Sequence, residues 1–192
     1  MSSKDFDNLS CKILIASPYV FYGDIFYKSL IYVMSHTDNG SIGVIVNHPI
    51  NQVPVKVLLS AFDEVVAKTV KDSAIPIHFG GPTELNKVVL LHSDDYIKKP
   101  LFQLQNNIAI SSDPEIIEDI IEGKGPSNSL LILGCTVWKS GELEREMSNN
   151  FWIASECDQD LIFAQENNDK WQVALNNLGI NNLQFSSLLG HS

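Results

Sequence analysis

Four side chains in the sequence are candidates for acid–base catalysis: His36, His92, Asp24 and Asp94. Histidine titrates near neutral pH and can take and return a proton, while an aspartate beside it can orient the ring. One of these histidines with one of these aspartates would suit a hydrolase-type enzyme, provided that the two come within roughly 3 Å. The alternative role for Asp24 is a cap or turn acceptor, which is the commoner use of aspartate in loops.

Cysteine and glutamate offer weaker possibilities. Cys135 is the candidate nucleophile, but a reactive thiolate needs a basic or helix-terminal setting, and only Lys139 suggests one. Glu142 and Glu144 open a predicted helix, yet residues two apart lie on different helix faces. Three cysteines without close pairing fit a reducing compartment, where thiols pack as small hydrophobes. We therefore assign no catalytic residue.

The histidines are not spaced to share a metal ion. His36 and His48 stand at opposite ends of a predicted hairpin, about 20 Å apart at roughly 3.3 Å per residue. If the next two strands also form a hairpin, His78 and His92 lie about 13 Å apart, which exceeds the span of one zinc site. A pairing of His36 with His92 stays open. We predict no metal and no cofactor.

Glycine and polar residues gather where the predicted strands end. Gly80 and Gly81 precede Pro82 in a sharp turn whose backbone amides could hold an anion, although no GxxxxGK[ST] or GxGxxG pattern accompanies it. Such strand ends, without a catalytic constellation, favour recognition of a protein or a small ligand. The candidate ligand or partner surface consists of Ser17, Pro18, Asn47, His48, Gly80, Gly81 and Trp138.

The elements that must position these residues begin with a β-hairpin. Residues 29–35 and 42–47 are rich in β-branched and aromatic side chains, and the sequence TDNG between them is a turn signal. Gly43 lies on the strand face opposite to Ile42 and Val44. A missing side chain inside a strand usually marks close approach by another backbone or ring, and we expect such an approach here.

Strands in runs, instead of strict alternation with helices, predict an α+β fold with a large mixed, mainly antiparallel sheet. The clearest helix has Asp113 as its cap and Pro114 at its first position, and it ends at Gly123. Other helices are predicted at 55–61, at 142–149 and after a cap at Asp169. Further strands are predicted at 12–16, 75–79, 87–92, 101–104, 107–110, 129–133 (closed by Gly134) and 151–154, while 161–163 is expected to be extended or short and 63–74 is unassigned.

The composition is that of an ordinary globular protein, with 44% hydrophobic and 19% charged residues among 192. A chain of this length buries about 70% of the surface of its unfolded form and needs no disulfide or metal for stability. No linker or repeat divides it, so we expect one domain over 1–192 with a flexible N-terminus at 1–11. No apolar run is of membrane-spanning length and no signal peptide is recognisable, which predicts a cytoplasmic protein.

The charge balance argues against a polyanionic partner. The net charge is −10, the 13 basic residues are scattered, and Arg145 is the only arginine. Affinity for nucleic acid comes mostly from lysine and arginine at phosphates, so direct nucleic-acid binding is not predicted. The acidic surface suits solubility as well as it suits a basic partner.

Blocks spread over nearly the whole sequence carry a family resemblance: LIASP, GDIFYKSLIYVMSH, GSIGVIVNHP, FGGP, LLHS, 138–144, 171–179 and the terminal GHS. Together they resemble the bacterial AlgH family, also called the YqgE-like proteins. The resemblance implies a compact α+β fold in which helices pack against the large sheet, and the family carries a label of transcriptional regulator of alginate synthesis without an established reaction, cofactor or catalytic residue. His48 stands where the family usually has arginine in an N-R-P block, and Cys135-Thr136-Val137 replaces its usual Tyr-Ala-Gly.

Three classes of function follow from the sequence. The favoured hypothesis is a regulatory or interaction module that binds a protein or small ligand through the candidate surface. The second is a hydrolase-type enzyme that uses a His/Asp pair. The third is a transcriptional regulator that acts on DNA directly or through a partner, and direct action would need a basic face that the sequence lacks.

We expect no shift of duplex DNA by micromolar protein in a gel assay at low salt. A chain of charge −10 repels phosphates, so the favourable non-specific baseline on which specific binding usually builds is missing. Low salt is the condition kindest to binding. A discrete shift that resists competitor DNA and weakens steeply with added salt would contradict this expectation and favour a direct regulator.

Overall fold

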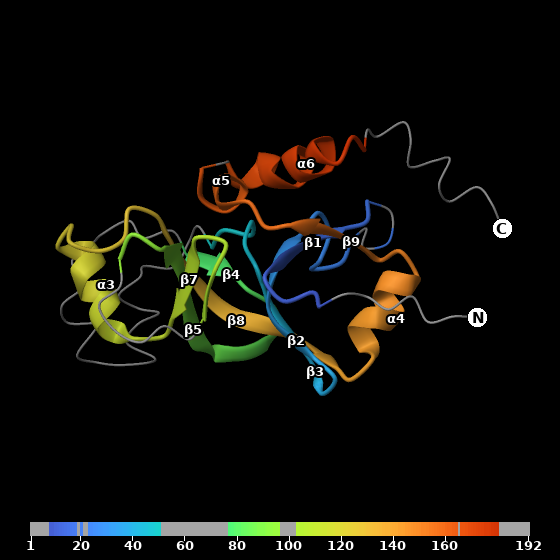
Figure 1. The fold of residues 1–192 in the computed structure, drawn as a ribbon, viewed down its shortest axis with the longest axis horizontal. Helices are drawn as coiled ribbons and strands as arrows, with labels where there is room; N and C mark the ends of the chain where they lie inside the picture. Colours follow the sequence, from blue (N-terminus) through green and yellow to red (C-terminus); the bar gives the residue numbers. More distant parts are fainter. Residues whose placement is uncertain are drawn as a thin grey trace.

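Nine strands form one sheet that curls around a central hydrophobic core in the computed structural model, which describes residues 8–18, 20, 23–50, 77–96, 103–164 and 166–180 (Figure 1). The strand order is β6-β7-β5-β8-β3-β2-β1-β9, and β4 pairs with β8 beside this path. Every pairing is antiparallel except that of β4 with β8. The predicted α+β fold with a mixed, mainly antiparallel sheet is therefore confirmed.

The strands are β1 (Lys12–Ala16), β2 (Leu30–Thr37), β3 (Gly40–Ile45), β4 (Ile77–Phe79), β5 (Thr83–Ser93), β6 (Gln103–Gln105), β7 (Ile108–Ser111), β8 (Ser129–Lys139) and β9 (Trp152–Glu156). The helices of the described residues are α3 (Pro114–Ile121), α4 (Glu142–Ser148), α5 (Gln159–Phe163) and α6 (Asn167–Asn177). The predicted hairpin is present as β2 and β3, joined at Thr37 and Gly40.

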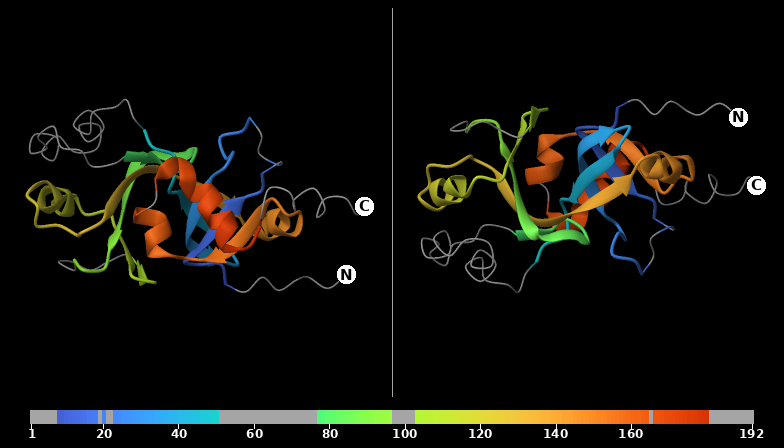
Figure 2. Two further views of the ribbon diagram at one scale, coloured as in Figure 1. Left: turned by 90° about the horizontal axis from the view of Figure 1, so that it is seen from above. Right: turned by 90° about the horizontal axis from the view of Figure 1, so that it is seen from below.

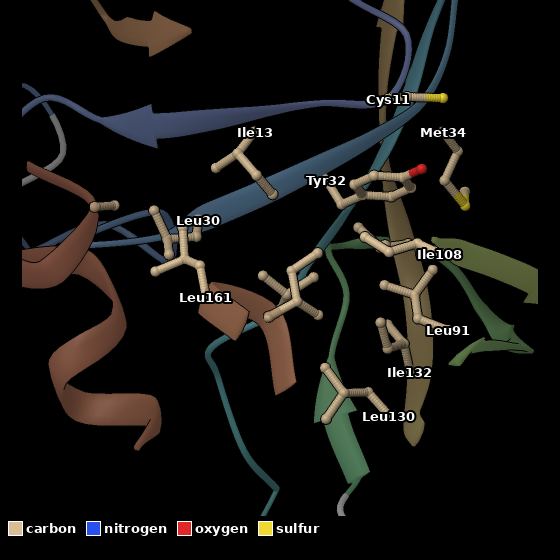
Figure 3. Packing of buried hydrophobic residues seen from close by; sticks show 14 of the residues in the cluster. Cys11, Ile13, Leu30, Tyr32, Met34, Leu91, Ile108, Leu130, Ile132 and Leu161 are labelled. Atoms are coloured by element: carbon tan, nitrogen blue, oxygen red, sulfur yellow. The ribbon is translucent and has the colours of Figure 1, made fainter. Parts of the chain in front are cut away.

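Three hydrophobic clusters lie on the two faces of the curled sheet. Alternate residues of one strand enter different clusters: Ile13 and Ile15 of β1 join the inner cluster, while Leu14 joins an outer one. The inner cluster draws on both ends of the sheet and on α5 and α6, as Figure 3 shows around Tyr32 and Leu91. Side chains that alternate in this way bury both faces of the central strands.

The helices cover separate parts of the sheet. α6 lies over β1 and β9, whereas α4 contacts β3, β8 and β9, and α3 lies at the far end from α4 (Figure 2). The Asp113 cap of α3 is confirmed, since its side chain accepts the N–H of Glu115. The Asp169 cap is wrong: α6 starts at Asn167 with Glu166 at the N-cap. Residues 161–163 belong to helix α5, and the predicted helix at 55–61 lies outside the described residues.

β8 is longer than predicted because Gly134 does not end it. Gly134 has φ +75° inside the strand and marks the place where β8 changes partners. Before this glycine β8 pairs with β4 on one side and β5 on the other. After it β8 pairs with β3, while the start of β5 still pairs at Cys135. The sequence left open a hairpin between the strands that carry His78 and His92. This hairpin is wrong, because β4 and β5 both pair with β8 and not with each other.

The N-terminal end of the described chain packs against the sheet. Leu9 and Cys11 are 4% and 1% exposed, so part of the segment 1–11, expected to be flexible, packs into the core. No helix among the described residues is long and apolar enough to cross a membrane.

Gly43→Val should destabilise the fold by about 1–3 kcal/mol, despite the better strand propensity of valine, because the site is overpacked. A Cβ at Gly43 would lie 2.6 Å from Cγ2 of Ile31 and 3.0 Å from the carbonyl oxygen of Tyr32. Urea unfolding measures the change. Ile42→Val, at a neighbouring residue that is 39% exposed, is the control and should hardly move the midpoint. An unchanged or higher midpoint for Gly43→Val would contradict the close approach.

Candidate functional site

A pocket of about 200 Å³ lies where α4 and the starts of β5 and β9 meet the second half of β8. Its lining combines aromatic rings, two carboxylates and two threonines, and no lysine, arginine or histidine is among these nine described residues. They are Phe26, Pro82, Thr83, Thr136, Val137, Trp138, Glu142, Glu146 and Trp152.

The centre of the pocket wall is Glu146, to which two tryptophans donate. The indole Nε1 atoms of Trp138 and Trp152 lie 2.8 and 2.7 Å from Oε2 of Glu146. The two rings meet edge to face with centroids 6.2 Å apart, and Phe26 meets Trp152 in the same way at 5.8 Å. Hydrogen bonds to a charged acceptor are stronger than neutral ones, so the two indoles fix the orientation of this carboxylate.

The sheet holds the two tryptophans of this group, and α4 holds Glu146. Trp138 pairs with Ser41 across β8 and β3, and Trp152 pairs with Ala16 across β9 and β1. Leu143, fully buried, anchors α4 on the same hydrophobic cluster as both tryptophans. The pocket therefore joins side chains from both ends of the chain at fixed positions.

Close packing of backbones brings the Pro82 side of the pocket to β8. A Cβ at Gly80 would lie 2.3 Å from the carbonyl oxygen of Gly134, and a Cβ at Gly81 would lie 2.5 Å from that of Cys135. Gly81 also has φ +146°, a backbone conformation that residues other than glycine rarely adopt. Only glycine lets the FGGP turn pass this close to β8, and the turn delivers Pro82 and Thr83 to the pocket.

The predicted surface residues divide between two places. Trp138 lines the pocket, and Gly80 and Gly81 support it without lining it. Ser17 is 8% exposed, and its backbone N–H donates to the carbonyl of Phe151, next to Trp152. These residues act on the pocket mainly by holding its frame, and half-buried Pro18 follows Ser17.

Asn47 and His48 instead bond to the segment before β2. Asn47 accepts the N–H of Leu30 at 2.8 Å and donates to the carbonyl of Lys28 at 2.9 Å. Nε2 of His48 lies 3.3 Å from Oγ of Ser29, and burial lowers the pKa of this histidine. Both residues join the segment after β3 to residues 28–30, and neither lines the pocket.

The His/Asp pairs of the hydrolase hypothesis do not form between these described residues. Nδ1 of His36 lies 2.8 Å from Oγ of Ser41, and its Nε2 lies 3.8 Å from Glu144. Ser41 is only 3% exposed, so its hydroxyl is out of reach of a substrate. Asp24 accepts the N–H of Phe26 at 3.0 Å, the turn role that was the alternative.

His92 and Cys135 are also placed for packing. His92 is fully buried, burial lowers its pKa, and its Nδ1 lies 2.8 Å from the carbonyl oxygen of its neighbour Ser93. Burial, and then the charge of Glu84, raises the pKa of the Cys135 thiol, which disfavours the nucleophilic thiolate. No group of three metal-ligating side chains lies together within the described ranges.

Sequence reasoning missed Glu146, Trp152 and Phe26. The pair Glu142 and Glu144 drew attention at the start of the helix, but Glu142 and Glu146, four residues apart, share one helix face. That spacing was the available signal for two carboxylates in one pocket. The pairing of both indoles with one carboxylate depends on contacts across β8, β9 and α4 and has no local signature.

The curled, mainly antiparallel sheet with helices packed against it defines the chain as a single-sheet α+β protein. The family described as AlgH-like matches residues 13–183, and the chain belongs to this family. The chain is 45% identical, over the full 192 residues of both chains, to UPF0301 proteins of Rickettsia canadensis and Rickettsia prowazekii.

Two solved structures share the fold. The solution structure of the AlgH protein from Pseudomonas aeruginosa has a TM-score of 0.73 with 24% identity and covers 100% of both chains. The crystal structure of protein DIP2367 from Corynebacterium diphtheriae has a TM-score of 0.67 with 21% identity over 92% of this chain and 90% of that one. At these identities the likeness concerns the fold.

A buried lysine lies near the Asn47 end of the sheet. Lys170 of α6 is 2% exposed, and its Nζ donates to the carbonyl oxygens of Ile162 at 2.5 Å and Val46 at 3.2 Å. Burial lowers its pKa to about 8, against a smaller opposite effect of Glu166. The amine ties α5, α6 and the end of β3 together.

Lys170→Met should remove a pH dependence of stability. Between pH 8 and 10.5 the unfolded chain holds a proton on Lys170 that the folded chain has lost, so the contribution of Lys170 to the unfolding free energy rises with pH there. The wild-type value minus the Lys170→Met value should increase by on the order of 3 kcal/mol across this window. Denaturant titrations of both proteins at several pH values measure it, and a constant or falling difference would contradict the lowered pKa.

Proposed function

We propose that this protein is a regulatory recognition module that binds a small organic ligand, or one side chain of a partner protein, in the pocket beside α4. The module works in the cytoplasm and influences other processes through what it binds, without chemistry of its own. Any effect on transcription then passes through a partner, because the charge of −10 disfavours direct contact with DNA.

The observation that carries this proposal is the oriented carboxylate of Glu146 beside open space. A carboxylate among aromatic side chains is costly unless hydrogen bonds satisfy it, and a purely structural cluster would be more stable with an apolar side chain filling the gap. Here the indole N–H groups of Trp138 and Trp152 both donate to Glu146. Beside this carboxylate a cavity of about 200 Å³ nevertheless stays unfilled by side chains. Preorganised polar groups in a concave, largely apolar lining are typical of ligand sites.

Filling the pocket should abolish ligand retention. Thr83 lines the pocket and is half-buried, so Thr83→Phe places a ring into the open space. Wild-type and variant proteins are incubated with small-molecule extract of the native cell, washed and denatured, and the released compounds are identified by mass spectrometry. We expect at least one compound that wild type retains and Thr83→Phe does not.

Lys87→Phe is the matched control, because it adds the same ring to an exposed position of the same strand, β5. This variant should retain the compound as wild type does, and circular dichroism should show both variants folded. If folded Thr83→Phe retains every compound that wild type retains, or if wild type retains none, the proposed function is wrong.

A further inference from the structure

The hydrogen-bonding groups of the pocket are acceptors almost throughout. Among the nine described side chains that line it, the indole N–H groups of Trp138 and Trp152 are the only N–H donors, and both already donate to Glu146. The hydroxyl of Thr136 donates to the carbonyl of Gly80 at 3.4 Å. Of the described lining side chains, only Thr83 keeps a donor for a ligand, since ionised carboxylates only accept.

Two carboxylates remain able to accept from a ligand. Glu142 and Glu146 lie four residues apart on α4 and both line the pocket. Oε1 of Glu146 takes no part in the two indole bonds, which both end on Oε2. Oε2 of Glu142 accepts the N–H of Lys139 at 2.9 Å, while its Oε1 lies 3.9 Å from Nη2 of the exposed Arg145. This long, exposed contact neutralises Glu142 only weakly.

The rest of the lining also favours positive charge. Phe26, Trp138 and Trp152 form an aromatic group in which ring edges meet ring faces. The faces of such rings carry negative charge density and attract ammonium and guanidinium groups. An anion in the pocket would meet the carboxylates of Glu142 and Glu146, and none of the described lining side chains is basic. Like charges within one pocket repel.

We propose that this pocket binds an organic cation: a primary ammonium or guanidinium group on a short aliphatic chain. This inference rests on the proposed function of the pocket as a ligand site. About 200 Å³ accommodates one such group and its chain, and is smaller than the usual volume of sites for drug-sized ligands, roughly 300–1,000 Å³. The cation comes either from a small molecule or from a lysine or arginine side chain of a partner.

The test compares probes of matched size and different charge at constant ionic strength. The probes are n-butylguanidinium, n-butylammonium, neutral butyramide and anionic butyrate. Two of the three tryptophans of the protein line the pocket, so their fluorescence reports occupancy, and calorimetry confirms it. We expect saturable binding of both cations, at affinities near the millimolar range of small fragments, and none of butyramide or butyrate.

Charge-neutralising variants locate the binding. Glu142→Gln keeps an acceptor for the N–H of Lys139 and removes the charge. It should therefore weaken the binding of n-butylguanidinium by about five- to tenfold. Glu122→Gln removes the same charge from the exposed end of α3 and should leave the affinity unchanged. Equal losses in both variants would mean general attraction to an acidic surface, and would overturn the proposed site.

The outcomes separate the two claims. If butyramide or butyrate binds as tightly as the cations, and Thr83→Phe abolishes that binding, the pocket is a ligand site but the inferred cation is wrong. If no probe binds, the inference is overturned, whereas the retention experiment on Thr83→Phe still judges the proposed function. A short peptide with one arginine that binds more tightly than n-butylguanidinium assigns the cation to a partner protein, and equal affinity assigns it to a small molecule.

Discussion

The structure depends on a backbone crossing that only glycine permits. At this crossing Gly80 and Gly81 pass β8 so closely that a methyl group on either would lie within 2.5 Å of a β8 backbone atom. In the same place, at Gly134, β8 exchanges its partner β4 for β3, while β5 stays paired with it as far as Cys135. One strand thus belongs to both halves of the curled sheet, and the inner core closes around it.

The pocket is a consequence of this crossing. Pro82 and Thr83, which follow the two glycines, line the pocket from one side. β8 contributes Thr136 and Trp138 to the same lining. α4 closes the arrangement because Glu146 accepts from Trp138 and from Trp152 of β9. A charged group in aromatic surroundings is tolerated when its hydrogen bonds are made, and these bonds also fix where β9 and α4 meet β8.

Local signals predicted the local elements. The TDNG turn gave the hairpin, and Asp113 with Pro114 gave α3, because turns and caps are decided by a few adjacent residues. Gly134 was misinterpreted as a strand end, since a glycine with positive φ serves equally as a stop and as a bend that another backbone requires. The sequence did not single out Glu146, because its role depends on hydrogen bonds from two tryptophans on different strands. These tryptophans are six and eight residues away along the chain.

The sharing of β8 also has a consequence during synthesis. β3 and β5 each pair with β8 (Ser129–Lys139), which is synthesised after them. β1 pairs with β9, which is synthesised later still. A nascent chain that has emerged as far as β5 therefore exposes strand edges and apolar faces that nothing yet covers. Such long-range pairing makes folding slow and leaves the growing chain open to aggregation until β8 and β9 have left the ribosome.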